Sequence, residues 1–104
     1  MNQKHYSYTI YTKRRKKVDL TPTLIRALNQ SHFTNGIINI TAPYPECTIL
    51  IEEQRGGRAG RDMGVSLTLP FFNLKLVTPT LKVVLIDHSN TSTRRKIHLT
   101  LIGE

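Results

Sequence analysis

Three arginines stand at three-residue spacing in the stretch QRGGRAGRDMG, residues 54–64: Arg55, Arg58 and Arg61. Glycine lets the backbone approach a bound anion closely, and the planar guanidinium of arginine binds phosphate oxygens through two hydrogen bonds at once. The stretch is not a Walker P-loop, because it lacks the lysine and the serine or threonine that end that motif. We interpret it either as an anion-binding loop facing a neighbouring subunit or as a flexible, solvated connection.

The other side chains able to catalyse a reaction or bind a metal are spread along the chain. The four histidines show no metal-ligand spacing: His5, His32, His88 and His98. A metal site would need Cys47, Glu53 and His88 from separate segments, so no metal or other cofactor is predicted. Cys47 lies inside an apolar strand pattern and is predicted to be a small buried residue rather than a nucleophile. A Ser–His–acid set could be drawn from Ser66, His88 and Asp87, but any chain of this length offers such a trio.

The chain is strongly basic, with 15 Lys and Arg against 7 Asp and Glu, and a net charge of +8. This balance raises the expectation of an anionic partner such as nucleic acid, a phosphorylated metabolite or an anionic membrane surface; the alternative is a merely basic surface. The charge gathers in three runs, residues 13–17, 55–61 and 94–96. These runs could follow a nucleic-acid backbone, with stacking surfaces from Tyr6, Tyr8, Tyr11 or Phe33. The alternation of Tyr6 and Tyr8 is, however, more simply that of a core face.

Length and composition predict one domain spanning residues 1–104. Apolar residues are only 38% of the chain, and so lean a chain often completes its burial by forming an oligomer. No apolar run of about 18 residues and no apolar signal core is present, so we expect a soluble, cytoplasmic protein with no membrane partner. The single cysteine fits a reducing compartment.

Hydrophobic alternation predicts a β-rich chain. Strands are expected at residues 5–12, 36–42, 47–53, 65–72, 74–77, 80–87 and 94–103. The nearly all-apolar 80–87 is predicted to be a central strand buried on both faces. One helix is expected to begin with Thr21 as N-cap and Pro22 as its first residue, and to end near His32. The predicted class is mainly β (α+β), an antiparallel β-sandwich of about eight strands with one covering helix.

Several stretches, in their order along the chain, resemble the YjbQ family, small β-rich proteins linked to thiamine phosphate synthase activity. They are VDLTPTLIRALNQSHFTNGIINITAPY, ILIEE, MGVSLTLPF and the closing VVLIDHSNTSTRRKIHLTLIGE. The resemblance implies a β-sandwich that packs as a homotrimer, with sites near the subunit boundaries. It also implies a longer, histidine-bearing segment before the GVSLTLP block, where this chain has only residues 54–63.

The family's site residues carry over only in part. Tyr44-Pro45-Glu46 stands where the family has His-Thr-Thr, and tyrosine is a poor zinc ligand. The positions that match the family pattern are Glu53, Ser66, Thr68, His88, Arg95 and Lys96.

The resulting hypothesis is a protein that binds a small phosphorylated or anionic ligand near a subunit interface without turnover. Its predicted ligand-binding residues are Arg55, Arg58, Arg61, Glu53, Ser66, His88 and Tyr44. The alternatives are a thiamine-phosphate-synthase-like enzyme, for which no general base or metal is visible, and a basic nucleic-acid-binding module. A purely structural role is a further alternative for the same residues.

Overall fold

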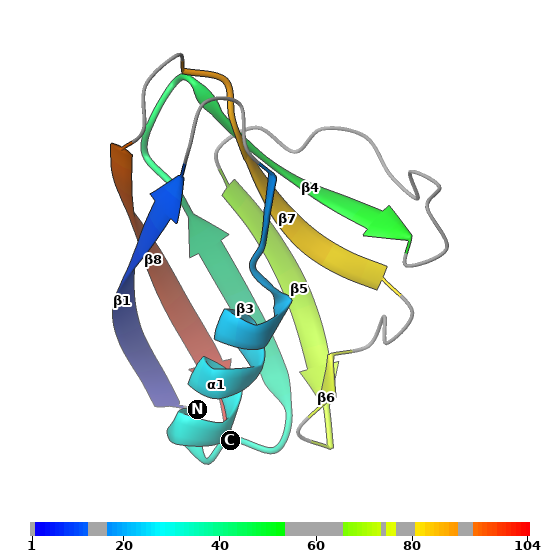
Figure 1. Cartoon of the computed structure of the whole chain (residues 1–104). Coiled ribbons are helices and arrows are strands. Elements are labelled where there is room, and N and C mark those ends of the chain that lie inside the picture. The colour runs from blue at the N-terminus through cyan, green and yellow to red at the C-terminus, as the bar shows by residue number, and fades with distance from the viewer. Residues whose placement is uncertain (1, 13–16, 54–65, 74, 77–80, 90–92) are drawn as a thin grey trace.

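A computed structural model of the chain describes residues 2–12, 17–53, 66–73, 75–76, 81–89 and 93–104. Two antiparallel sheets and one helix make up this part of the chain (Figure 1). The predicted class, mainly β with a single covering helix, is confirmed. No helix in the described ranges is long and apolar enough to cross a membrane.

The larger sheet has five strands in the order β1-β8-β3-β5-β6. They are β1 (Asn2–Thr12), β8 (Thr93–Gly103), β3 (Gly36–Thr41), β5 (Ser66–Phe72) and β6 (Lys75–Leu76). Each neighbouring pair is antiparallel, and the first and last long strands of the sequence, β1 and β8, are paired along eleven residues. The two ends of the chain therefore lie side by side at one edge of this sheet.

The smaller sheet has three strands in the order β2-β7-β4. They are β2 (Lys17–Asp19), β7 (Leu81–Asp87) and β4 (Cys47–Glu53). The prediction that β7 is central and buried on both faces is confirmed, because three successive residues are almost fully buried: Val83, Val84 and Leu85. β2 was not predicted, since three residues at the end of a basic run are too few to show alternation.

The helix α1 (Thr21–Ser31) begins one residue earlier than predicted, at Thr21 instead of Pro22. Leu20 is the N-cap and makes no side-chain capping bond, while the Asp19 carboxylate accepts a hydrogen bond from the Thr21 backbone N–H at 2.9 Å. The Thr21 hydroxyl is used elsewhere, because it accepts from the backbone N–H of Val83 at 3.0 Å. Thr21 thus ties the helix to β7 instead of capping it.

One face of α1 packs on the inner face of the five-stranded sheet. Its buried residues recur at helical spacing: Leu24, Ala27, Leu28 and Ser31. The Tyr8 hydroxyl of β1 donates to Gln30 Oε1 at 3.1 Å, which joins the sheet to the end of the helix. The helix stops where predicted, at His32, whose backbone is left-handed with φ 62°.

The core lies between the five-stranded sheet on one side and the three-stranded sheet with α1 on the other. Alternate residues of the long strands fill it: Ile38, Ile40, Leu67, Leu69, Phe71, Ile97, Leu99 and Leu101. The smaller sheet adds Cys47, Ile49, Val83 and Leu85. Tyr6 and Tyr8 pack partly buried against this core, as the simpler interpretation of their alternation predicted. The opposite, outer face of the five-stranded sheet is exposed along β1, β5 and much of β8.

Candidate functional site

Four strand ends meet at one end of the five-stranded sheet. β1 ends at Thr12, which lies opposite Thr93 at the start of β8. β3 ends at Thr41, which lies opposite Ser66 at the start of β5. Thr41 also pairs with His98, the sixth of the eleven residues of β8, so the ends of β3 and β5 are level with the middle of β8, and all four ends point to the upper end of the sheet in Figure 1.

Two of the three basic runs of the sequence are continuous with this end. Residues 13–17 follow directly on Thr12, and residues 94–96 open β8. The third run, residues 55–61, stands in the sequence between Glu53 of β4 and Ser66 of β5 and lies outside the described residues. We call this part of the sheet the basic end. Two basic runs far apart in the sequence thus join the fold at one place, which raises the local positive potential.

The outer face at the basic end carries cations with no acidic neighbour in the sheet. The cations Arg94 and Lys96, with the imidazole of His98 after them, alternate outward along β8 and are exposed. They lie opposite three exposed residues of β1: Tyr11, Thr9 and Ser7. None of the strands β1, β3, β5, β6 and β8 contains an Asp or Glu. The cations of this face are therefore not neutralised by carboxylates of their own sheet.

The two histidines of this face are held by hydroxyl groups on the neighbouring strand. His98 Nδ1 lies 3.0 Å from Ser7 Oγ, and His5 Nδ1 lies 3.0 Å from Thr100 Oγ1. Each bond joins residues that are directly opposite in the β1–β8 register. Both imidazoles are thus oriented on the exposed surface of the sheet.

Next to them, one amide links a group of hydroxyls across β3 and β5. Asn39 Nδ2 donates to Thr68 Oγ1 at 2.9 Å and to Ser66 Oγ at 3.1 Å. The Thr41 hydroxyl donates to Asn39 Oδ1 at 3.0 Å and lies 3.2 Å from Ser66 Oγ. The Asn39 amide and the Thr41 hydroxyl use their hydrogens inside this group, so the hydroxyls of Ser66 and Thr68 are the groups suited to donate to the oxygens of an anion.

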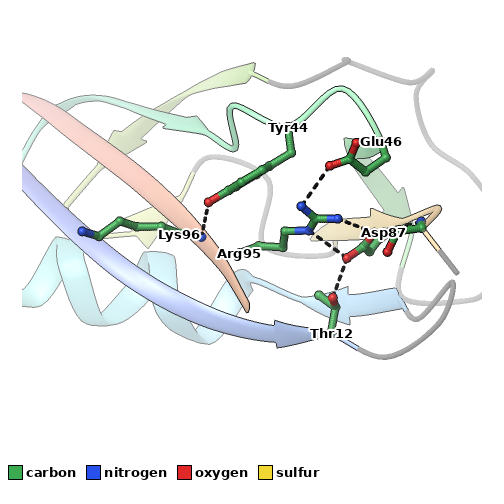
Figure 2. A network of polar contacts seen from close by, with 7 residues as sticks. Thr12, Tyr44, Glu46, Asp87, Arg95 and Lys96 are labelled. Carbon is green, nitrogen blue, oxygen red and sulfur yellow. Dashed lines mark hydrogen bonds and ion pairs between the residues drawn. The ribbon is translucent and has the colours of Figure 1, made fainter. Parts of the chain in front are cut away.

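Behind this face, Arg95 forms a buried ionic network that links the two sheets (Figure 2). Its Nε donates to Asp87 Oδ2 at 2.9 Å and its Nη2 to Oδ1 at 3.3 Å, while Nη1 lies 2.9 Å from Glu46 Oε1. Thr12 Oγ1 and the Ser89 backbone N–H also donate to Asp87. Burial disfavours the charged carboxylate, but the hydrogen bonds from Arg95, Thr12 and Ser89 outweigh it and hold the pKa of Asp87 well below its usual range. Two carboxylates neutralise Arg95, so its guanidinium is a structural group and not a free anion-binding cation.

Tyr44 completes the network from the loop after β3. Its ring lies under the guanidinium, 4.7 Å from the Arg95 Cζ to the ring centroid, a cation–π contact. Its hydroxyl accepts a hydrogen bond from the Lys96 backbone N–H at 2.9 Å (Figure 2). Because β3 has already ended at Thr41, the hydroxyl supplies an acceptor that the ladder no longer offers there. Tyr44 therefore fixes the start of β8, which carries the cations of the outer face.

The predicted ligand-binding residues fall into two groups within the described residues. Tyr44 belongs to the network, and His88 lies beside it, since its backbone N–H donates to the Glu46 carbonyl at 2.8 Å. The exposed His88 ring has its Nε2 3.3 Å from Thr48 Oγ1. Ser66 instead makes its contacts on the outer face.

The remaining predicted site residues are on or near the segment after β4. Glu53 is the last residue of β4 and lies opposite Leu81 of β7. Arg55, Arg58 and Arg61 lie outside the described residues.

The described residues offer little for covalent or metal chemistry. Among them, no group of three or more His, Cys, Asp or Glu side chains lies close enough to hold a metal ion. Cys47 is buried, as predicted, and burial followed by the nearby Asp87 raises the pKa of its thiol to about 11. At neutral pH this thiol is protonated and is a poor nucleophile.

The ionic network was missed from the sequence, although a signal was present. Arg95 has the same strand parity as Ile97 and Leu99, and Asp87 has the same parity as Leu85. A charged residue at an inward position must find a buried partner, so the two parities together pointed to a pair.

Comparison with known proteins supports the fold. No protein-family model matches this chain, and no curated protein matches it. Among solved structures, a "YbjQ-like protein of unknown function" from Sulfolobus solfataricus is 20% identical, with a TM-score of 0.78, covering 99% of this chain and 100% of the other. A hypothetical protein from Aeropyrum pernix is 16% identical, with a TM-score of 0.81 and coverage of 97% and 99%. An uncharacterized protein of the YjbQ family from Clostridium acetobutylicum is 16% identical, with a TM-score of 0.78 and coverage of 93% and 99%. The fold is thus YjbQ-like, as the sequence resemblance predicted.

Proposed function

We propose that this protein binds a small phosphorylated or otherwise anionic ligand at the basic end of the five-stranded sheet and does not turn it over. The observation that carries the proposal is the continuity of two basic runs, residues 13–17 and 94–96, with one end of a sheet whose strands contain no acidic residue. A positively charged sheet end attracts anions, and oriented hydroxyl groups beside it give directional hydrogen bonds.

In this proposal Lys96 supplies a charge on the outer face, and the Ser66 hydroxyl, which accepts from Asn39, donates to an anion oxygen. Arg55, Arg58 and Arg61 act as charge clamps, since their segment leads directly into Ser66. His88 and Tyr44 act as positioning groups, whereas Glu53 lies six residues along β4 from Cys47, which is opposite Asp87, and has no role in this proposal. Tyr44 acts through its bond to the Lys96 backbone and through its contact with Arg95.

Binding without turnover is favoured by the chemistry of the described residues around the site. Arg95 is neutralised by Asp87 and Glu46, and the Cys47 thiol stays protonated. His98 and His5 are bonded to hydroxyls and not to carboxylates, so neither forms the acid–histidine pair of a general-base site. The resemblance to a family linked to thiamine phosphate synthase activity is one of fold, and fold alone does not carry an activity.

The test is calorimetric titration of the full chain with inorganic pyrophosphate at low salt. Lys96→Gln and the triple variant Arg55→Gln, Arg58→Gln, Arg61→Gln are each expected to weaken binding roughly tenfold or more, because a charged hydrogen bond is worth about 1.5–3 kcal/mol. Lys75→Gln is the matched control, since Lys75 is exposed on β6, away from the basic end.

Two results would overturn the proposal: no pyrophosphate binding at millimolar concentration, or equal loss in the Lys75 and Lys96 variants. Release of inorganic phosphate during the titration would contradict the absence of turnover. We also propose a homotrimer with this site near a subunit boundary, and light scattering on the same samples gives the mass that tests it.

A further inference from the structure

Two exposed aromatic rings mark opposite corners of the outer face. Tyr11, 71% exposed, lies at the basic end of β1 directly opposite Arg94. Phe72, 62% exposed, ends β5 at the far end of the sheet. Phe72 is joined there by Ile37, which is 41% exposed and lies opposite Pro70. Exposed aromatic rings on a sheet with basic residues are the stacking surfaces that single-stranded nucleic-acid-binding proteins use.

The separation of the two rings excludes a small ligand that touches both. Tyr11 is opposite Arg94 on β8, and His98 lies four residues further along that strand. His98 is level with Ser66 of β5, because both are paired with Thr41 of β3. Phe72 lies six residues beyond Ser66 along β5. The two rings are therefore ten strand residues apart, roughly 33 Å at about 3.3 Å per residue. A ligand that uses both ends of this face must be a polymer.

The surface between the rings suits a chain of nucleotides. The imidazoles of His98 and His5 are planar and oriented, and Asn39 holds the hydroxyls of Ser66 and Thr68 in place. Hydroxyls can pair with base edges, and planar rings can stack on bases. The strands that form this surface contain no carboxylate to repel phosphates.

We propose that the outer face of the five-stranded sheet binds a single-stranded nucleic acid, with the phosphates at the basic end and the bases stacked on Tyr11 and Phe72. The inference rests on the proposed function, because the same cations would hold the phosphates. It corrects the stacking surfaces considered from the sequence, since Phe33 is buried and Tyr6 and Tyr8 face the core. A duplex fits this surface less well, because its bases are already stacked on one another.

The experiment is fluorescence anisotropy with labelled twelve-nucleotide thymidine and uridine strands and a twelve-base-pair duplex, titrated with the full chain. We expect the single strands to bind more tightly than the duplex. The strength of thymidine against uridine binding then tells DNA from RNA. The slope of log K against log salt is expected to be about −0.7 per phosphate held, and less steep by about that amount in Lys96→Gln.

Two variants separate stacking from charge. Phe72→Ala and Tyr11→Ala are expected to weaken strand binding about 5- to 150-fold each, the range for the loss of one base–aromatic stack. Both should leave pyrophosphate binding unchanged, whereas Lys96→Gln should weaken both ligands. Ile25→Ala is the matched control, because Ile25 is a 46% exposed apolar residue on α1, which covers the opposite face of the sheet. Circular dichroism confirms that each variant folds.

The two proposals fail in different ways. If pyrophosphate does not bind, the anion site itself is absent and the inference falls with it. If pyrophosphate binds but the strands bind no more tightly than the duplex, or Phe72→Ala and Tyr11→Ala bind strands as the wild type does, only the inference is overturned. If Phe72→Ala lowers the molecular mass in solution, a second copy of this chain covers that corner, and the inference is again overturned.

Discussion

Removing the Asp87 carboxylate should cost a large part of the stability of this fold. Asp87 is fully buried and receives hydrogen bonds from Arg95, Thr12 and Ser89. In Asp87→Ala, the Arg95 guanidinium stays buried with Glu46 as its remaining ionic partner. Breaking a buried ion pair in this way costs about 3–5 kcal/mol. A domain of this size has about 5–15 kcal/mol of unfolding free energy in total, so the variant should be near the limit of folding.

A double variant tests where the cost of Asp87→Ala comes from. If the cost comes from the charge left without its partner, removing both charges should recover most of it. Asp87→Leu combined with Arg95→Met is therefore expected to be more stable than Asp87→Ala by about 2–3 kcal/mol, because apolar residues of similar volume often replace a buried ion pair at little cost.

The contribution of Asp87 to the free energy of unfolding should fall as the pH is lowered. The pKa of Asp87 is lower in the folded chain than its ordinary value near 3.9, so the stabilisation is present above about pH 4 and is lost as the pH falls toward the folded pKa. Below about pH 4 the wild type should lose up to about 1.4 kcal/mol per pH unit from this group. Asp87→Asn lacks this contribution and should show a flatter curve.

Urea denaturation followed by circular dichroism measures both effects. With a urea slope of about 1–3 kcal/mol per molar, a loss of 3 kcal/mol moves the midpoint by about 1–3 M. Lys17→Gln is the control, because the Lys17–Glu52 pair is half-exposed on its lysine side and should be worth less than about 1 kcal/mol. An Asp87→Ala variant within about 0.5 kcal/mol of the wild type would refute the argument, since that is the spread of ordinary surface substitutions. So would a double variant no more stable than the single one.

Further predictions concern three single residues. Tyr44→Phe keeps the ring over Arg95 but removes the acceptor of the Lys96 N–H, so it should lose about 1 kcal/mol in urea denaturation, against no loss for the exposed Tyr11→Phe. Because its pKa is about 11, the Cys47 thiol should react with a thiol reagent at pH 8 far more slowly in the native chain than in urea, and equal rates would contradict its burial. The same raised pKa should lower stability as the pH rises from about 9 toward about 11. In Gly36→Ala the added Cβ would stand 2.1 Å from the Ile102 carbonyl oxygen, so thermal denaturation should show a loss of about 1–3 kcal/mol or more; a wild-type melting temperature would contradict this clash.

Most strands could be predicted because their apolar and polar residues alternate in the sequence. In β8, Ile97, Leu99 and Leu101 alternate with exposed residues, and that pattern follows from one buried and one exposed face. β2 shows no such alternation in the sequence, because Lys17–Asp19 has only one partly buried residue, Val18. The start of α1 was misplaced by one residue because Thr21 bonds to β7, a contact that no local pattern contains.

The basic end could not be predicted, because it depends on the order of strands in the sheet. His5 and Thr100 are 95 residues apart in sequence and lie opposite one another. Only the order β1-β8-β3-β5 brings the end of β1 and the starts of β8 and β5 to the same place. The sequence shows separate basic runs, and pairing between the two ends of the chain brings two of them, residues 13–17 and 94–96, to one end of the sheet.

The buried network also decides how much of the run Arg94-Arg95-Lys96 reaches a ligand. Alternation along β8 sends Arg94 and Lys96 to the outer face and Arg95 to the interior, where Asp87 and Glu46 neutralise it. The three-residue run therefore presents two outward charges. Because Tyr44 and Arg95 fix the start of β8, a variant of either should weaken ligand binding through lost stability. Lys96→Gln changes the outward charge while its backbone bond to Tyr44 remains, so it measures the contribution of charge to binding separately from that of the fold.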